Sequence, residues 1–441
     1  MKTTLKHTAL ALACAWALAL PARGQESRRL TLDEVRRVAA ANNATVRVAD
    51  LERRLAHVRY RQSDAALLPH VSVGYQALVT DHPMHAFGFL LQQSGVTAQS
   101  FDPAKLNHPD ATANYGAALD VQLPLLNLDH LYARKAARLQ EEVYADKAQY
   151  TRDYIDFEVS KAYAQLQLAH RSRTILMGTL ADVRRIHQSV ANFETQGLVQ
   201  RSDVLNAQVQ VNTVESALAR AESHIANASE ALLLLMGEPL EASPRYVPDS
   251  LEQLLPRATA ALNLAGRGDV QALQKAVEAS QLMVKSARLR FAPRVNAFGS
   301  FQLNDRKVFG FGNGSYLAGV SLNWSLFSGN ADRYKLRAAQ VQHAKMQQEL
   351  AQHLDRSLLE ARKTARDLSD LQTDIAKHTA SVGQAAEALR ILADRHREGL
   401  ASTTDLLQAQ TQHAQQQLLQ AQAVMNYNIT QYYQDLLLTN P

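Results

Sequence analysis

Two short stretches carry the acidic residues whose spacing is most informative. In each, an aspartate stands six positions after a glycine that is followed by leucine, and Leu, Ala and Gln then recur at matching places. An aspartate in such a place can accept hydrogen bonds from free N–H groups at a helix start, or present a fixed negative charge to solvent. The members are Gly197, Leu198, Asp203, Leu205, Ala207 and Gln208 in the first copy, and Gly399, Leu400, Asp405, Leu407, Ala409 and Gln410 in the second.

Each stretch predicts the tip of a helical hairpin. The glycine can take the positive φ with which many helices end. Ser202 in the first copy, and Thr403 or Thr404 in the second, is predicted to cap the helix that follows, with the aspartate in its first turn. We therefore expect two antiparallel helices to meet at each tip.

The other reactive side chains form no catalytic or ligand-binding set. Cys14 is the only cysteine and lies in a predicted leader, so neither a disulfide nor thiol chemistry is expected. His82 and His85 lie in a long loop at a spacing that matches no common set of metal ligands. The glycine-rich residues 309–314 predict a strand hairpin and not a phosphate-binding loop, because a strand follows them. We expect no enzyme, no cofactor and no metal site.

Composition and the first residues limit the class of protein. Among 441 residues there are 18 glycines, 12 prolines and 6% aromatic residues, which favours long, closely packed helices. Lys2 and Lys6, an apolar run over residues 8–20 and small residues up to Gly24 predict a secretory signal peptide over residues 1–24. No later apolar run approaches the roughly 20 residues of a membrane helix. The formal charge of +5 is not gathered into a basic block, so nucleic-acid binding is not expected.

Alternation with a period of two predicts two pairs of strands. Residues 70–80 and 113–125 alternate between apolar side chains and small or polar ones, and a long loop over residues 81–112 joins them. Residues 296–304 and 316–327 form the second pair around a short hairpin. Each run has about ten residues, which is the length of a tilted transmembrane β-strand.

Long helices are predicted between and after the strands. Residues 31–66, broken at Asn42–Asn43, and residues 269–290 each precede a strand pair, and long helices with almost no Gly or Pro start at residues 129 and 330. Within them, apolar residues recur at the four-three spacing of a coiled-coil seam. These residues are Ile155, Val159, Ala162, Leu166 and Ala169 in the first helix, and Leu354, Leu358, Ala361, Ala365 and Leu368 in the second.

The order of elements occurs twice. Leu123 matches Trp324 and Asp203 matches Asp405 at a nearly unchanged offset, which indicates a tandem duplication. The expected divisions are a signal peptide (1–24), N-terminal helices (25–67), a first strand pair with a long extracellular loop (68–128), a first long helical hairpin (129–237), an equatorial segment (238–268), a helix (269–291), a second strand pair (292–329), and a second long hairpin with the C-terminus (330–441).

Four transmembrane strands in one chain do not close a barrel. An open sheet in lipid would leave backbone groups without hydrogen bonds, at a cost of several kcal/mol each. Three copies would give a twelve-stranded β-barrel, and their helices would continue as a trimeric α-barrel. The small and polar strand face would line a wet lumen, whereas Tyr75, Tyr316 and Trp324 would face or border lipid. The expected fold class is thus mainly α with transmembrane β.

The chain resembles the TolC-type outer-membrane efflux proteins over essentially its whole mature length. The resemblance is carried by residues 30–34 (LTLDE), 326–329 (LFSG) and 267–269 (RGD), together with both tips. It implies a homotrimer in outer-membrane lipid that extends into the periplasm. It also implies a passive exit duct of a tripartite efflux or type I secretion system, which docks to a periplasmic adaptor and an inner-membrane pump.

The resemblance also implies roles for the tip residues. Gly197, Leu198, Gly399 and Leu400 would form the surface that docks to the adaptor. Asp405 would line the pore mouth as one ring of carboxylates, because Gln408 stands where the family often has a second acid. Asp203, with Ser202 beside it, would contact His396 in a latch that protonation of His396 strengthens.

Two departures and one rival interpretation accompany this resemblance. Leu128 replaces the glycine that the second half has as Gly329 at the strand-to-helix joint, and Ala401 replaces an arginine of the family's latch. A periplasmic coiled-coil structural protein or adaptor would explain the helices but not the two strand pairs. Drug, metal and protein export stay open as alternatives for the cargo.

Overall fold

The structure is a computed structural model that describes residues 27–240, 245–256 and 264–438. The predicted signal peptide lies outside the described residues. The chain divides into two compact units. Unit one consists of residues 1–48, 149–267 and 356–441, and unit two consists of residues 49–148 and 268–355. Among the described residues, no helix combines the length and the apolar character needed to cross a membrane.

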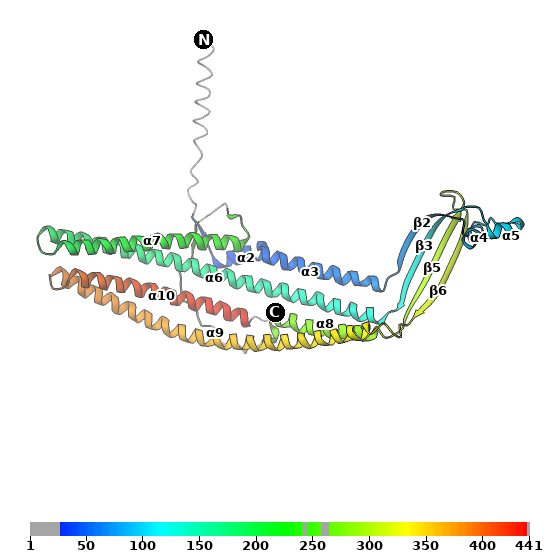
Figure 1. The fold of residues 1–441 in the computed structure, drawn as a ribbon. Helices are drawn as coiled ribbons and strands as arrows, with labels where there is room; N and C mark the ends of the chain where they lie inside the picture. The colour runs from blue at the N-terminus through cyan, green and yellow to red at the C-terminus, as the bar shows by residue number, and fades with distance from the viewer. Residues whose placement is uncertain (1–26, 241–244, 257–263, 439–441) are drawn as a thin grey trace, which may run out of the picture. The chain divides into compact units, whose positions relative to one another are not determined.

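The long helices form two antiparallel hairpins, whose tips and second helices belong to unit one (Figure 1). Helix α6 (Leu128–Thr195) is followed by α7 (Arg201–Met236), and α9 (Ala331–Arg397) is followed by α10 (Thr403–Leu438). The observed bounds agree with the predicted hairpins to within one or two residues. Both predicted tips, at Gly197 and Gly399, therefore exist.

The first predicted seam is the core of unit one. All five of its side chains, from Ile155 to Ala169, are buried. They pack in one cluster with α2 (Leu32–Asn42), where Thr31 caps the helix by accepting a hydrogen bond from Glu34 N at 3.3 Å. A parallel pairing of β1 (Ser27–Leu30) with β4 (Arg245–Pro248), which was not predicted, brings the buried Tyr246 into this cluster.

The second predicted seam is less buried. Leu354, Leu358, Ala361 and Leu368 are only half-buried, and Ala365 is exposed. The four-three spacing recurs, but within a single chain this seam is not buried as the first one is. The physical reason is that no counterpart of α2, β1 and β4 packs against this part of α9 among the residues that the structure describes.

Unit two contains a four-stranded antiparallel sheet in the order β2-β3-β5-β6 (Figure 1). Its strands are β2 (His70–Thr80), β3 (Thr112–Leu126), β5 (Arg294–Asp305) and β6 (Asn313–Asn323). Helices α3 (Ala44–Gln62) and α8 (Gly268–Leu289) precede the two strand pairs. The last strand ends at Asn323, before the predicted residue 327, because its partner β5 begins at Arg294, directly opposite Asn323. The indole of Trp324 just beyond donates a hydrogen bond to the Phe291 carbonyl at 2.9 Å.

The register gives the sheet one polar face and one apolar face. Gln76, Gly116, Asn304 and Asn313 stand side by side across the four strands on the polar face. The apolar face carries large exposed side chains: Val73 is 77% exposed and Tyr316 is 84% exposed. Because strands β2 and β6 are the edges of the sheet, each has a free side within the described chain.

The segment between β2 and β3 is not the unstructured loop that the sequence predicted. It folds into α4 (Pro83–Gln92), a 3-10 turn (Ala98–Phe101) and α5 (Pro103–Asn107). Pro83 and Pro103 stand in the first turns of the two helices, where proline is well tolerated, and Asp102 caps α5 through Ala104 N at 2.9 Å. Both prolines therefore mark helix starts inside the segment that the sequence predicts to be a loop.

Candidate functional site

Both tips end their first helix in the same way. Leu198 N donates to the Phe193 carbonyl at 2.9 Å, and Leu400 N donates to the Arg395 carbonyl at 2.8 Å. Gly197 and Gly399 have φ values of +75° and +73°. These are the contacts of a Schellman motif, which needs a left-handed residue that is almost always glycine. The predicted role of the two glycines as helix stops is confirmed.

The predicted caps of the second helices are wrong. Helix α7 is capped by Gln200, whose N–H donates to the Asp203 carboxylate at 3.1 Å, and Ser202 only donates to the Gln200 side chain at 3.3 Å. In the second tip Ser402, not a threonine, exchanges hydrogen bonds with Asp405 at 2.7–3.2 Å. Each aspartate reaches back three residues, as the acid of a capping box does, so the cap lies three positions before it.

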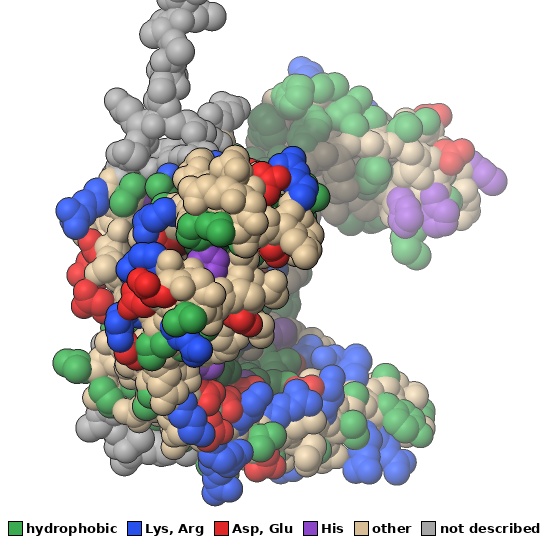
Figure 2. Space-filling model, turned by 90° about the vertical axis from the view of Figure 1, so that its left-hand side faces the viewer, with side chains coloured by type: hydrophobic (Ala, Val, Ile, Leu, Met, Phe, Trp, Pro, Cys, Tyr) green, Lys and Arg blue, Asp and Glu red, His purple; other side chains and the backbone are tan. Residues whose placement is uncertain are grey.

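The end surface of the tips combines apolar and charged groups (Figure 2). Leu198 is 66% exposed and Leu400 is 69% exposed, although the residue in this place of a Schellman motif frequently packs back onto its helix. Asp405 and Gln408 are exposed one turn apart on α10. Hydrogen bonds from the Ser402 hydroxyl and N–H lower the pKa of Asp405, so its carboxylate stays ionised at neutral pH.

His396 is not at the exposed end of the tip. Its side chain is buried, Nε2 lies 3.3 Å from Thr403 Oγ1 of the same hairpin, and the ring centroid lies 5.9 Å from that of Phe193 in the other hairpin. Burial lowers the pKa of the imidazole. The contact between His396 and Asp203 that the sequence predicted is absent from the interactions of the described residues, since Asp203 is engaged with Gln200 and His396 with Thr403.

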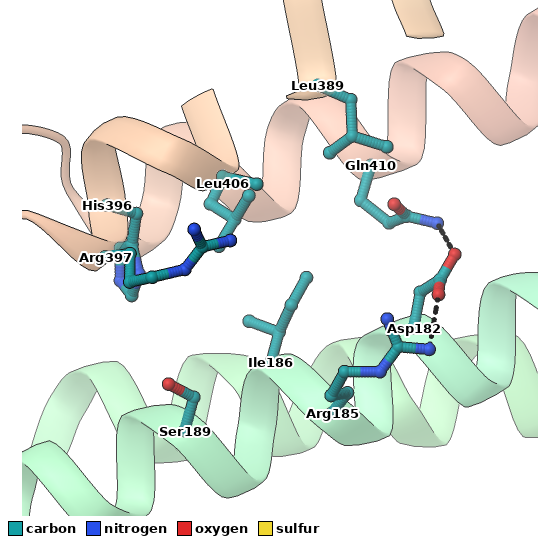
Figure 3. Close-up of a pocket in the computed structure, with 10 residues that line it drawn as sticks. Asp182, Arg185, Ile186, Ser189, Leu389, His396, Arg397, Leu406 and Gln410 are labelled. Atoms are coloured by element: carbon teal, nitrogen blue, oxygen red, sulfur yellow. Dashed lines mark hydrogen bonds and ion pairs between the residues drawn. The ribbon is translucent and has the colours of Figure 1, made fainter. Parts of the chain in front are cut away.

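A cleft of about 320 Å³ lies between the two hairpins, behind the tips (Figure 3). Asp182 on α6 accepts a hydrogen bond from Gln410 of α10 at 3.3 Å and forms an ion pair with Arg185 at 3.2 Å. A second polar contact joins the hairpins, from Gln210 Nε2 to Thr411 Oγ1 at 2.9 Å. Sequence reasoning missed Asp182 and Gln210, because a polar residue on a long helix gives no sign of a partner two hundred positions away.

An apolar cluster accompanies these polar contacts. Leu407 of α10 is 8% exposed and packs with Ala207 and Val211 of α7 and with Val183 of α6. Leu407 is one of the repeated tip residues, so its type and spacing were visible in the sequence. Its role in joining the two hairpins was not predicted. Among the described residues, the contacts between the two hairpins near the tips thus include the buried Leu407, two polar contacts and the ring contact of His396.

No metal centre is found in the part of the chain that the structure describes, where no three His, Cys, Asp or Glu side chains are grouped for ligation. The rings of His82 and His85 lie 4.8 Å apart at the start of α4 without a third ligand beside them.

The chain was compared with known protein families and structures. The family model described as "Outer membrane efflux protein" matches residues 35–238 and 261–436. Outer membrane protein OprJ of Pseudomonas aeruginosa is 26% identical over 367 residues, which cover 77% of this chain and 72% of OprJ. Among solved structures, the outer membrane protein VceC of Vibrio cholerae has a TM-score of 0.79 at 19% identity, covering 93% of this chain and 96% of VceC.

A second solved structure gives the same result for the fold. The CmeC outer membrane channel of Campylobacter jejuni has a TM-score of 0.79 at 14% identity, covering 95% of this chain and 90% of CmeC. The family model matches well over half of the chain, in both halves of the tandem repeat. The chain therefore belongs to the outer membrane efflux protein family, whose members are passive channels of the outer membrane and not enzymes.

Proposed function

We propose that three copies of this chain form the outer-membrane exit duct of a tripartite efflux or type I secretion system. The duct is passive, extends into the periplasm, and docks through its helix tips to a periplasmic adaptor and an inner-membrane pump. The observation that carries this proposal is the four-stranded sheet, which has an apolar face, a polar face and two free edges.

The free edges support closure between copies. In lipid, each unpaired backbone group costs several kcal/mol, so β2 and β6 need partners that the described part of this chain does not supply. Pairing β6 of one copy with β2 of the next satisfies both edges, and three copies close a twelve-stranded barrel. The exposed apolar side chains of one face, such as Val73, Tyr316 and Leu322, would then face lipid.

A second unpartnered surface supports contact between copies. Val48, Leu51, Leu55 and Val58 are each 49–60% exposed and follow one another along α3 at the three-four spacing of a coiled-coil seam. In solvent such a stripe would be unfavourable. A helix of the neighbouring copy would cover it and extend the assembly below the barrel.

The tips supply the docking and pore-mouth surfaces in this proposal. Exposed Leu198 and Leu400, each held outward beside its glycine, suit an apolar groove between helices of an adaptor. Asp405 contributes one ring of three carboxylates at the pore mouth, with Gln408 uncharged beside it. For the closed state we propose that burial of His396 against Phe193 replaces the predicted ion pair, and that Asp203 and Ser202 fix the start of α7.

Native mass and planar-bilayer recording of the detergent-extracted protein test this function together. A trimer from the outer-membrane fraction that gives discrete, small conductance steps is expected. A monomer that is absent from that fraction and silent in bilayers would refute the duct.

A further inference from the structure

The end of α4 is bound to the polar face of the sheet. Gln93, the residue after α4, donates from Nε2 to Asn114 Oδ1 at 2.9 Å and to the Ala113 carbonyl at 2.8 Å, and its own carbonyl accepts from Asn313 Nδ2 at 2.6 Å. Asn114 Nδ2 in turn donates to Asn304 Oδ1 at 2.9 Å. The partners lie on three adjacent strands, β3, β5 and β6, and the three asparagines all stand on the polar face.

This contact buries one end of a face that is otherwise open. Asn114 is 2% exposed, Asn304 is 4% exposed and Gln93 is 7% exposed. Two residues further along β5 on the same face, Gln302 is exposed. The C-terminal end of α4 therefore packs against the polar face at the loop end of the strands. The segment 81–111 is here called the lid.

The opposite face is covered by aromatic rings at the same end. The β5–β6 hairpin places Phe309 on Tyr75, with ring centroids 4.9 Å apart, and Phe309 N donates to Tyr75 Oη at 3.1 Å. Phe309 and Phe311 hold φ values of +53° and +50°, a left-handed backbone that bulky residues rarely adopt. Aromatic side chains gathered at one end of an apolar strand face are typical of the girdle at a membrane interface. The apolar face is thus the lipid side, and the lid lies on the lumen side.

We propose that the lid narrows the outer mouth of the duct and limits the size of solutes that pass it, which rests on the proposed trimer. Met84, Leu91 and Phe101 of the lid are 56–76% exposed in one chain. Three lids gathered in one mouth would cover these apolar groups with one another. Within the described residues, Gln93 Oε1 and Asn304 Nδ2 are buried without hydrogen-bond partners. The amide cluster therefore holds the lid with two buried amide atoms unsatisfied, which lowers the net stabilisation that the cluster supplies.

A single introduced thiol reports on access through the mouth. Ala118→Cys lies on the polar face of β3, four residues beyond Asn114, to which the lid is bound. Intact cells would be treated from outside with a small membrane-impermeant maleimide, and in parallel with maleimides on polyethylene glycol chains of increasing size. Val73→Cys on the apolar face is the control and should react with none of them. We expect Ala118→Cys to react with the small reagent and progressively more slowly with larger ones.

Two lid variants complete the test. Replacing residues 83–109 by a short Gly-Ser turn should remove the dependence on reagent size. Asn304→Ala should speed the labelling by large reagents roughly fivefold, as expected for one lost hydrogen bond. Gln302→Ala, on the same strand and face but exposed, should change nothing.

Labelling of Ala118→Cys that is independent of reagent size in an intact trimer overturns the lid. So does a size limit that survives removal of the lid, or reaction at Val73→Cys in place of Ala118→Cys. Native mass on the same samples separates the two proposals, since loss of the trimer itself refutes the duct.

Discussion

Leu407 provides a quantitative test of how the two hairpins are held together. It is 8% exposed and is the α10 side chain buried in a cluster with Ala207 and Val211 of α7. Leu407→Ala removes most of a buried side chain, which costs about 2–5 kcal/mol. We use the lower end, about 2 kcal/mol, because a site near two tips can relax. If the tips open by separation of the hairpins, the open population rises roughly thirtyfold.

The assay is the open probability of single channels in planar bilayers, at fixed salt and pH. Leu419→Ala is the matched control, because Leu419 lies on the same helix but is 38% exposed, and its truncation should change the equilibrium by less than about 0.5 kcal/mol. Both variants should remain trimeric by native mass. If Leu407→Ala is trimeric and its open probability equals that of the control, this cluster does not hold the closed state.

Three further predictions concern the tips. Burial lowers the pKa of His396, so packing of its neutral ring is fully favourable above about pH 6.5 and weakens as pH falls through the lowered pKa. Conductance should therefore rise in acid, which is the opposite of what an ion pair between His396 and Asp203 would give. The variant His396→Phe should abolish that rise. Leu198→Asp combined with Leu400→Asp should abolish export in cells while native mass still shows a membrane-inserted trimer, and loss of the trimer would show that these residues are structural. Asp405→Asn should lower the cation selectivity of the channel, measured as a reversal potential. The unmodified channel should keep its selectivity down to about pH 4, because hydrogen bonds lower the pKa of Asp405.

The sequence was sufficient for the elements that depend on local periodicity. Alternation predicted β2 without error, and the absence of helix breakers predicted α6 and α9 to within two residues. The glycine stops were also predictable, because few other residues take a positive φ. Caps were harder to predict, since Gln200, Ser202 and Ser402 all carry oxygens able to accept a backbone hydrogen bond.

What the sequence did not predict depends on contacts between distant residues. The lid is held through Asn304 and Asn313, which lie about two hundred positions from Gln93 in the sequence. Its helices are too short to be stable alone, so their sequence is hard to distinguish from that of a loop. His396 shows the same limit. Its position suggested an exposed charge, but Phe193 in the other hairpin and Thr403 in its own enclose it.

The two hairpins differ in how firmly a single chain holds them, although their tip sequences repeat. Val159 and Leu166 of α6 are fully buried against α2 and α7, with Tyr246 of β4 in the same cluster. In α9, all of which the structure describes, the buried residues are Ser357, Thr364, Ile375 and His396, so a single aliphatic side chain is among them. The long helix of the second hairpin thus buries few apolar side chains, and Ile375 packs in a cluster with Ala423 and Tyr427 of α10. If one hairpin moves when the duct opens, these contacts make it the second one, with Leu407, Gln410 and Thr411 as the attachments that must break.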